Sequence, residues 1–341
     1  MQKIYTLIVL MAVVLLGTSC NDEWKEEQYD HYIGFRSPLN NKGVTEIYVP
    51  FSRKGADGAS AEGISNYQIP MIVSGSTTNQ QNFTVKVAHD PDTLQTLNIA
   101  RYQHRTDLFY DDMGKKELGF VDFPGTIDFK AGEDVTLLNL KFDFRGIDMS
   151  KKWVLPLTVV NDPSADYKPH PRKNYDKAIL RIYPFNDFSG NYSGTALLNF
   201  VKGDEGSGSI VANTVTGYVV DDNTVFFYAG NIDEDRTDRA NYKVFAEFNG
   251  AETGGVVNFS AENPSMEFKN NKEASYRIIE EMDAIRPYLK RRYVIINNID
   301  YEYTDYTSVP GSEINYIVRG SLTLVRTFNT QVPDEDQAIE W

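Results

Sequence analysis

Residues suited to ligand recognition gather near the C-terminal end of the sequence, where tyrosines alternate along a predicted strand. Tyr301 and Tyr303 share one face of that strand, and Asp305 and Tyr306 follow. A flat aromatic face beside a carboxylate can stack on a pyranose and hold its hydroxyl groups. We predict a carbohydrate contact at these four residues, with Trp341 as a second candidate because a chain end seldom buries an indole. The alternative, that these are ordinary strand residues covering a core, is the commoner role of such side chains.

Signatures of catalysis are missing from the sequence. The four histidines are scattered singly, and Cys20 is the only cysteine, so no zinc site is predicted. There is also no G-x-S-x-G elbow and no phosphate-binding glycine loop. The 48 acidic residues would supply the two carboxylates of a glycosidase by chance, so composition is no evidence for hydrolysis. We expect no catalytic residue, no metal and no cofactor.

An acidic stretch in the second half of the chain looks superficially like a calcium loop. It contains Asp233, Glu234, Asp235 and Asp238. A calcium loop needs glycine at its sixth position, which here is Asp238, and glutamate at its twelfth, which here is Val244. The sequence favours a solvated acidic loop and leaves weak calcium binding of another geometry open.

The N-terminus has the layout of a secretory lipoprotein signal. Lys3 precedes an apolar stretch over residues 4–16 that is too short to span a bilayer, and small residues lead to Cys20. We predict that residues 1–19 are removed and that Cys20 becomes the acylated N-terminus. Acylation explains a lone cysteine at a signal junction better than a disulfide or a metal site does.

An acidic linker follows at residues 20–28. Its Asp22 and Glu23 resemble the tag that sends lipoproteins of the Bacteroidetes to the outer face of the outer membrane, although a merely solvated linker would look similar. We therefore expect a lipid-anchored, surface-exposed protein of the outer membrane. The net charge of −14 and the pI near 4.8 argue against nucleic acid as a partner.

Short alternating runs from Thr45 onward predict an all-β protein. Leu138, Leu140 and Phe142, for example, alternate with polar residues, which is the period of half-buried strands. The spacing predicts an immunoglobulin-like β-sandwich over residues 29–183. Pro156 lies inside one apolar run and predicts an edge strand or a bulge there.

A proline and paired glycines mark a predicted domain boundary near residue 184. A second series of strands follows over residues 184–341 and predicts a β-barrel or a second sandwich. One segment, residues 272–289, is ambiguous because Ile278, Met282 and Ile285 recur at helical spacing. We expect a helix or a long loop at that segment.

Several runs of residues resemble a known family. The runs are Tyr32-Ile33-Gly34-Phe35, Trp153-Val154-Leu155-Pro156-Leu157, Phe188-Ser189-Gly190-Asn191-Tyr192-Ser193-Gly194, and the stretch from Tyr316 to Arg326. Together with the signal they resemble a Bacteroidetes lipoprotein family with two domains of unknown function. The N-terminal domain of that family also occurs ahead of endo-glycosidase modules, and the C-terminal one is β-rich. The resemblance implies a place beside SusC/SusD-type glycan importers, and it carries over no catalytic or binding residue.

These observations lead to one expected function and two alternatives. We expect a non-catalytic accessory lipoprotein that binds an oligosaccharide or polysaccharide at the cell surface. A surface glycoside hydrolase and a structural or adhesin-type protein are the alternatives. We further expect the sugar site on the C-terminal domain, residues 188–341, with the N-terminal domain as a spacer and docking module.

Overall fold

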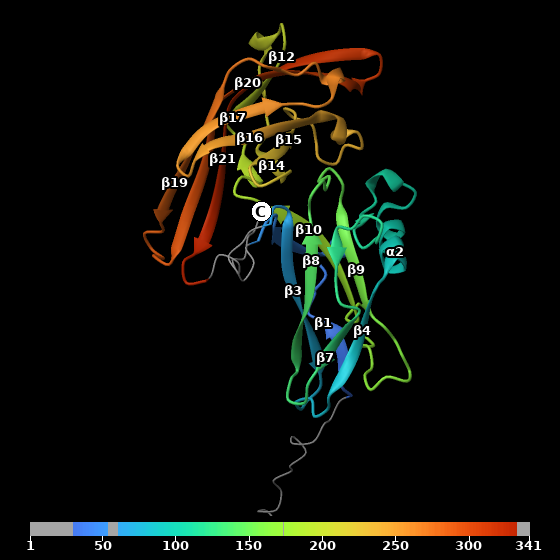
Figure 1. Ribbon diagram of the computed structural model, residues 1–341. Helices are drawn as coiled ribbons and strands as arrows, with labels where there is room; N and C mark the ends of the chain where they lie inside the picture. The colour runs from blue at the N-terminus through green and yellow to red at the C-terminus, as the bar shows by residue number, and fades with distance from the viewer. Residues whose placement is uncertain (1–29, 54–60, 173, 333–341) are drawn as a thin grey trace, which may run out of the picture.

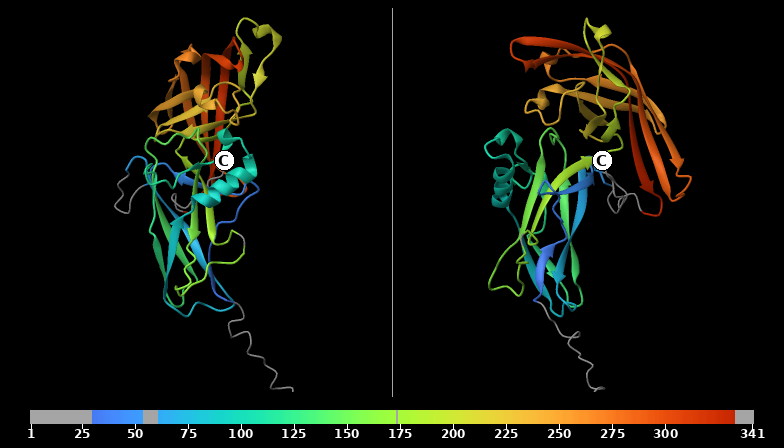
Figure 2. Two further views of the ribbon diagram at one scale, coloured as in Figure 1. Left: turned by 90° about the vertical axis from the view of Figure 1, so that its right-hand side faces the viewer. Right: turned by 180° about the vertical axis from the view of Figure 1, so that it is seen from behind.

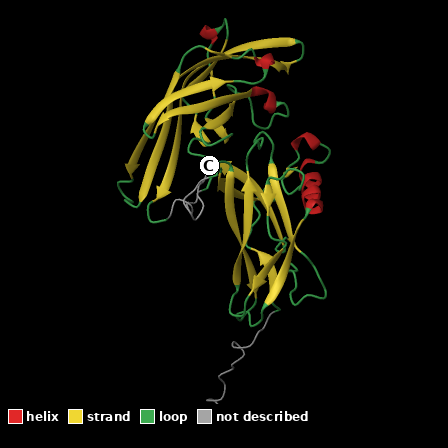
Figure 3. Ribbon diagram, viewed as in Figure 1, coloured by secondary structure: helices red, strands yellow, loops and turns green. Residues whose placement is uncertain are grey.

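The computed structural model describes residues 30–53, 61–172 and 174–332. Two β-rich domains follow each other along the chain and lie end to end (Figures 1 and 2). Strands dominate both domains, and α2 is the one α-helix within the described ranges (Figure 3). The predicted all-β class is confirmed. No helix in these ranges is long and apolar enough to cross a membrane.

The N-terminal domain is a sandwich of two sheets. One sheet has the order β1 (Tyr32–Phe35), β3 (Ile64–Ser74), β8 (Val135–Asp143) and β6 (Val121–Asp122). The other has the order β2 (Thr45–Pro50), β10 (Lys177–Phe185), β9 (Trp153–Val159), β4 (Phe83–His89) and β7 (Thr126–Phe129), with β5 (Asp111–Asp112) also paired to β9. Leu138, Leu140 and Phe142 of β8 are buried between the sheets. Their alternation with exposed residues is the pattern that the sequence analysis used.

Strand β9 is central in its sheet, although Pro156 predicted an edge strand or a bulge. The strand lies between β10 and β4. On the β4 side, pairing with β4 ends at Leu157, and pairing with β5 begins only at Val154. Pro156 occupies the gap between the two partners, and its carbonyl accepts a hydrogen bond from Asp90 N at 3.0 Å. A missing N–H is harmless there because no partner strand lies opposite it.

Helix α2 (Pro91–Tyr102) covers the outer face of the second sheet and was not predicted from the sequence. Asp90 is its N-cap and accepts a hydrogen bond from Thr93 N at 3.1 Å, and Pro91 opens its first turn. Leu94 packs in a small apolar cluster with Val154 and Ile179, on the side of the sheet that faces away from the main core. The helix is thereby anchored to the sheet, and the short 3-10 helix η2 (Thr106–Leu108) follows it along the chain.

The C-terminal domain is one curled sheet that closes on itself. Its order is β13 (Ile210–Val211), β12 (Leu197–Val201), β21 (Ser312–Asn329), β11 (Gly190–Ser193), β14 (Thr214–Val219), β15 (Thr224–Tyr228), β16 (Lys243–Ala251), β17 (Gly254–Ser260), β19 (Ala274–Met282), β20 (Leu289–Val309) and β18 (Lys269–Asn270). The long hairpin of β20 and β21 provides the closing pair (Figure 1). Three 3-10 helices, η3 (Glu205–Ser207), η4 (Arg239–Tyr242) and η5 (Pro264–Met266), lie in the connections. Closure removes most of the open edges that a strand series would expose.

The expected helix or long loop at residues 272–289 is wrong. Residues 274–282 form β19, which pairs with β20 from Ser275↔Asn297 to Met282↔Lys290. The apolar residues at helical spacing do not share a buried face, since Met282 and Ile285 are 51% and 90% exposed. The helical spacing of these residues therefore does not reflect a buried helix face. Pairing with the neighbouring strands determines the conformation of this segment instead.

The connection between the domains is a short linker, residues 186–189, which is buried except for the exposed Asp187. Asn186 Nδ2 donates to the carbonyl of Asp221 at 2.7 Å, and the Asn186 side-chain oxygen accepts from Phe188 N at 2.9 Å. Arg326 of β21 donates to the carbonyls of Asn186 and Ser189, at 2.9 and 2.7 Å. These bonds make the linker part of the C-terminal core.

Candidate functional site

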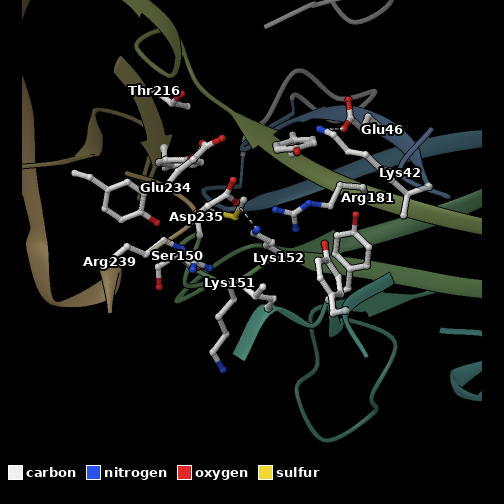
Figure 4. Close-up of a pocket in the computed structure, with 18 of the residues that line it drawn as sticks. Lys42, Glu46, Ser150, Lys151, Lys152, Arg181, Thr216, Glu234, Asp235 and Arg239 are labelled. Atoms are coloured by element: carbon white, nitrogen blue, oxygen red, sulfur yellow. Dashed lines mark hydrogen bonds and ion pairs between the residues drawn. The ribbon is translucent and has the colours of Figure 1, made fainter. Parts of the chain in front are cut away.

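A pocket of about 620 Å³ lies where the two domains meet (Figure 4). Its walls come from β2, β10, α2 and the loop before β9 on one side, and from β14, β15, η4 and the loop after β15 on the other. A second hollow of about 610 Å³ adjoins it on the C-terminal domain and shares Tyr218, Tyr228 and Glu234 with it. The two hollows together offer room for more than one sugar ring.

Tyrosines are the main aromatic lining of the pocket. They are Tyr48, Tyr102, Tyr110, Tyr183, Tyr218 and Tyr228. Strands β2 and β10 run parallel and place Tyr48 directly opposite Tyr183, and the two rings stack with centroids 5.3 Å apart. Ile47 and Val49 of β2 point into the sandwich, so Tyr48 between them faces outward. Both stacked rings are half-buried.

The tyrosines of the C-terminal wall are more deeply buried. Tyr218 Oη donates to Glu234 Oε2 at 2.6 Å. Burial raises the pKa of Tyr218, and the charge of Glu234 raises it further. Burial also raises the pKa of Tyr228 to about 12. Both phenols therefore stay neutral and serve as hydrogen-bond donors at physiological pH.

Polar contacts across the domain boundary hold the two walls of the pocket in place. Lys152 Nζ lies 3.0 Å from Asp235 Oδ1, and Lys243 Nζ lies 2.6 Å from Asp148 Oδ1. The buried guanidinium of Arg239 donates to the carbonyl of Ser150. Figure 4 shows the ion pair of Lys152 with Asp235 inside the pocket.

The acidic stretch at residues 233–238 forms part of this boundary, and its carboxylates are already engaged. Asp235 pairs with Lys152, Glu234 accepts from Tyr218, and Asp238 pairs with Arg236 at 2.7 Å. Within the described part of the chain, no group of three or more metal-ligating side chains is arranged to hold an ion.

The structure buries three of the residues predicted to contact sugar. Tyr301 and Tyr303 do share one strand face, but that face points into the closed sheet, and the rings are 4% and 1% exposed. Tyr301 Oη accepts from Gly230 N at 3.1 Å. Asp305 is also buried, while Tyr306 is half-buried with its Oη bonded to Asn263. These side chains serve the core and its hydrogen bonds, and none of them lines the pocket.

Four other residues named from the sequence lie outside the described residues. Cys20, Asp22, Glu23 and Trp341 all belong to the terminal segments. The acylation site, the export tag and the indole contact stay predictions.

Family comparisons identify both halves of the chain. Residues 24–163 match DUF4973, a domain of unknown function, and residues 176–323 match a BT3044-like C-terminal domain. Neither description is that of an enzyme. No match was found among curated proteins.

Three crystal structures from Bacteroides are similar over nearly the whole chain. An auxiliary nutrient binding protein from Bacteroides thetaiotaomicron VPI-5482 is 54% identical, with 92% of this chain and 100% of that chain covered and a TM-score of 0.81. A protein of unknown function from Bacteroides ovatus is 41% identical, with 91% and 100% covered and a TM-score of 0.79. A multidomain protein including DUF1735 from the same species is 39% identical, with 91% and 100% covered and a TM-score of 0.77. The chain therefore belongs to the same family as these Bacteroides proteins.

Proposed function

We propose that this protein is a non-catalytic accessory protein of nutrient uptake that binds an oligosaccharide in the pocket between its two domains. The observation that carries the proposal is the stacked, half-buried pair Tyr48 and Tyr183 in an open pocket of about 620 Å³. Aromatic platforms with nearby hydrogen-bond donors suit the apolar faces and hydroxyl rims of sugars. The relative that is called an auxiliary nutrient binding protein supports a role in uptake.

The carboxylates of the pocket support binding rather than hydrolysis. A glycosidase needs one carboxylic acid with a raised pKa to protonate the leaving group. The hydrogen bond and charge of Lys152 instead lower the pKa of Asp235. Glu46 is paired with Lys42 at 3.2 Å, and Glu234 is bonded to Tyr218. All three carboxylates of the described lining are thus engaged by other side chains.

Binding can be tested with the chain from residue 21 onward. A glycan array would identify ligands, and isothermal titration with a hit would compare Tyr48→Ala with the parent. We expect affinity to fall about 5- to 10-fold, since one stacking ring contributes roughly 1 kcal/mol. Tyr288→Ala is the matched control, because Tyr288 is exposed in the β19–β20 connection. Equal losses in both variants, or turnover of the ligand, would contradict the proposal.

We also propose that the protein is anchored by lipid at Cys20 on the outer face of the outer membrane, next to a SusC/SusD-type importer. The signal layout and the acidic residues Asp22 and Glu23 support this location. Replacing Cys20 by serine should move the protein from the membrane fraction to the soluble one.

Replacing Asp22 and Glu23 by alanine should leave the lipid but protect the protein from protease added to whole cells. Unchanged protease access would argue against the export tag.

A further inference from the structure

The pocket between the domains is basic, although the chain as a whole is acidic. Its lining holds seven lysine and arginine side chains against three aspartate and glutamate side chains, while the whole chain has a net charge of −14. Clefts lined by one sign of charge concentrate ligands of the opposite sign. The positive charge of the lining therefore arises from how the fold places these residues and not from the overall composition.

Two of the basic side chains are buried and have no carboxylate partner among the described residues. Arg181 and Arg239 are 6% and 9% exposed. Arg181 Nη1 donates to the carbonyl of Trp153 at 3.0 Å, and Arg239 Nη1 donates to the carbonyl of Arg236 at 2.9 Å. No ion pair joins either guanidinium to an acidic residue in the described ranges. A buried guanidinium without a compensating anion is costly to desolvate.

Arg181 also keeps donors free for a ligand. Within the described residues its only hydrogen bond is the one from Nη1, and its guanidinium stacks over the ring of Tyr183 at 4.9 Å. Within the described chain, Nη1 is thus the engaged donor of this guanidinium, which leaves Nε and Nη2 for a ligand. Figure 4 shows Arg181 extending from β10 into the pocket, toward the loop that carries Asp235. A guanidinium in this position can bind a carboxylate or a sulfate through two parallel hydrogen bonds.

The acidic residues of the pocket do not cancel this charge. Glu46 and Asp235 are paired with Lys42 and Lys152. Glu234 is the remaining acid of the lining, and its Oε2 accepts from Tyr218. The pocket therefore retains an excess of positive charge beside the stacked tyrosines.

We propose that the ligand of this pocket is an acidic oligosaccharide, one that carries carboxylate or sulfate groups, and that Arg181 binds its anionic group. The inference rests on the proposed sugar-binding function and names the class of sugar. The tyrosine-rich lining contacts the sugar ring, and the arginines that no described carboxylate pairs with meet its charge.

Matched pairs of polymers test the proposal and separate the two kinds of anion. Polygalacturonate against its methyl ester reports on carboxylates, and dextran sulfate against dextran reports on sulfates. An array of neutral, uronate-bearing and sulfated glycans accompanies them. We expect binding to the acidic member of at least one pair or to acidic glycans of the array, with affinity falling as salt is added. Binding to neutral glycans only would overturn the acidic class and leave the sugar-binding function standing. Absence of binding to every glycan would overturn both.

Variants assign the anion to Arg181. We expect Arg181→Gln to weaken binding of the acidic ligand about 10-fold or more, which is typical for loss of a charge-assisted hydrogen bond. Arg101 lies at the exposed end of α2 in the same lining, so the Arg101→Gln variant should fold. It therefore tests the charge of the pocket even if Arg181→Gln fails to fold. It should weaken binding less but still reduce the salt dependence. Arg277→Gln, an exposed arginine on β19 outside the pocket, should bind like the parent. Equal affinity of the folded Arg181→Gln and Arg277→Gln proteins would overturn the assignment.

Discussion

Asp305 is the most heavily hydrogen-bonded carboxylate of the C-terminal domain. It accepts from Tyr242 Oη at 2.9 Å and from the backbone N–H groups of Thr307 and Ser308 at 3.1 and 3.0 Å, and it pairs with Arg236 at 3.3 Å. Burial alone would raise its pKa, but these hydrogen bonds outweigh burial and hold the pKa well below its usual range.

Replacing Asp305 by asparagine should lower the free energy of unfolding by about 2 kcal/mol, because several donors lose a charged acceptor. A group with a lowered pKa stabilises the fold above its unfolded pKa of about 3.9 and loses that effect as the pH falls. The difference between parent and variant should therefore be full at pH 7 and shrink below about pH 4. Urea unfolding at several pH values would measure it, with the exposed Asp222→Asn as control. A difference that stays constant down to pH 2 would contradict this role for Asp305.

The alternation of Tyr301 and Tyr303 predicted correctly that they share a strand face, but not which side of the sheet that face covers. A period of two gives the same pattern for an inward and an outward face. Only the closure of the sheet through β20 and β21 assigns the tyrosine face to the interior. The neighbouring carboxylate of Asp305, which suggested a sugar contact, belongs to the network beneath η4 instead.

Helix α2 shows how one cap can position part of the pocket. The Asp90 carboxylate accepts from Thr93 N and pairs with Lys177 of β10. The last turn of the helix places Arg101 and Tyr102 in the pocket lining. The start of the helix is thereby tied to the sheet, and its end reaches the site.

Replacing Asp90 by alanine should destabilise the protein by about 1 kcal/mol, the usual cost of a lost N-cap. Ligand affinity should also fall, since Tyr102 is carried by the same helix. Thermal unfolding and isothermal titration would report the two effects. Asp92→Ala is the matched control, because Asp92 is an exposed acid in the same first turn and caps nothing. If both variants lost the same stability, the cap would not be what holds the helix.

The sequence predicted most strands but missed helix α2 and misjudged β19. In α2 only Leu94 and Asn98 are buried, so the helix has no apolar stripe that a periodicity argument could detect. Its only sequence signal is Asp90 followed by Pro91, a cap and a first-turn proline. In β19 the helical spacing was accidental, and the pairing of eight of its nine residues with β20 outweighed it.

At the scale of the whole molecule, the contacts between the domains should control the width of the pocket. Arg239 bonds to Ser150, and Lys243 pairs with Asp148, in both cases across the boundary. The double variant Arg239→Ala with Lys243→Ala should let the domains vary in their relative orientation and increase the radius of gyration in small-angle X-ray scattering. Arg277→Ala with Lys269→Ala removes two exposed cations elsewhere on the C-terminal domain and is the control. Identical scattering from both double variants would show that the boundary does not depend on these contacts.

The pocket itself was beyond the reach of sequence analysis. Its residues come from segments as distant as Tyr48 and Arg239, and no local motif links them. A local signal did exist for Tyr48, since it lies between the core residues Ile47 and Val49 and must face outward. What the outward face meets depends on how the second domain is placed, which strand patterns do not encode.

The linker at residues 186–189 has a kinetic consequence. Binding proteins with hinged lobes close around their ligands, so that association includes a conformational step and release waits for reopening. Here Arg326 and Asn186 fix the linker to the C-terminal domain, and Arg239 and Lys243 join that domain to the N-terminal one. The two walls are therefore already in place before any ligand arrives. Capture should then proceed in a single step whose rate is set by diffusion and electrostatic attraction. Release of the proposed sugar ligand should then be limited by its own contacts with the pocket.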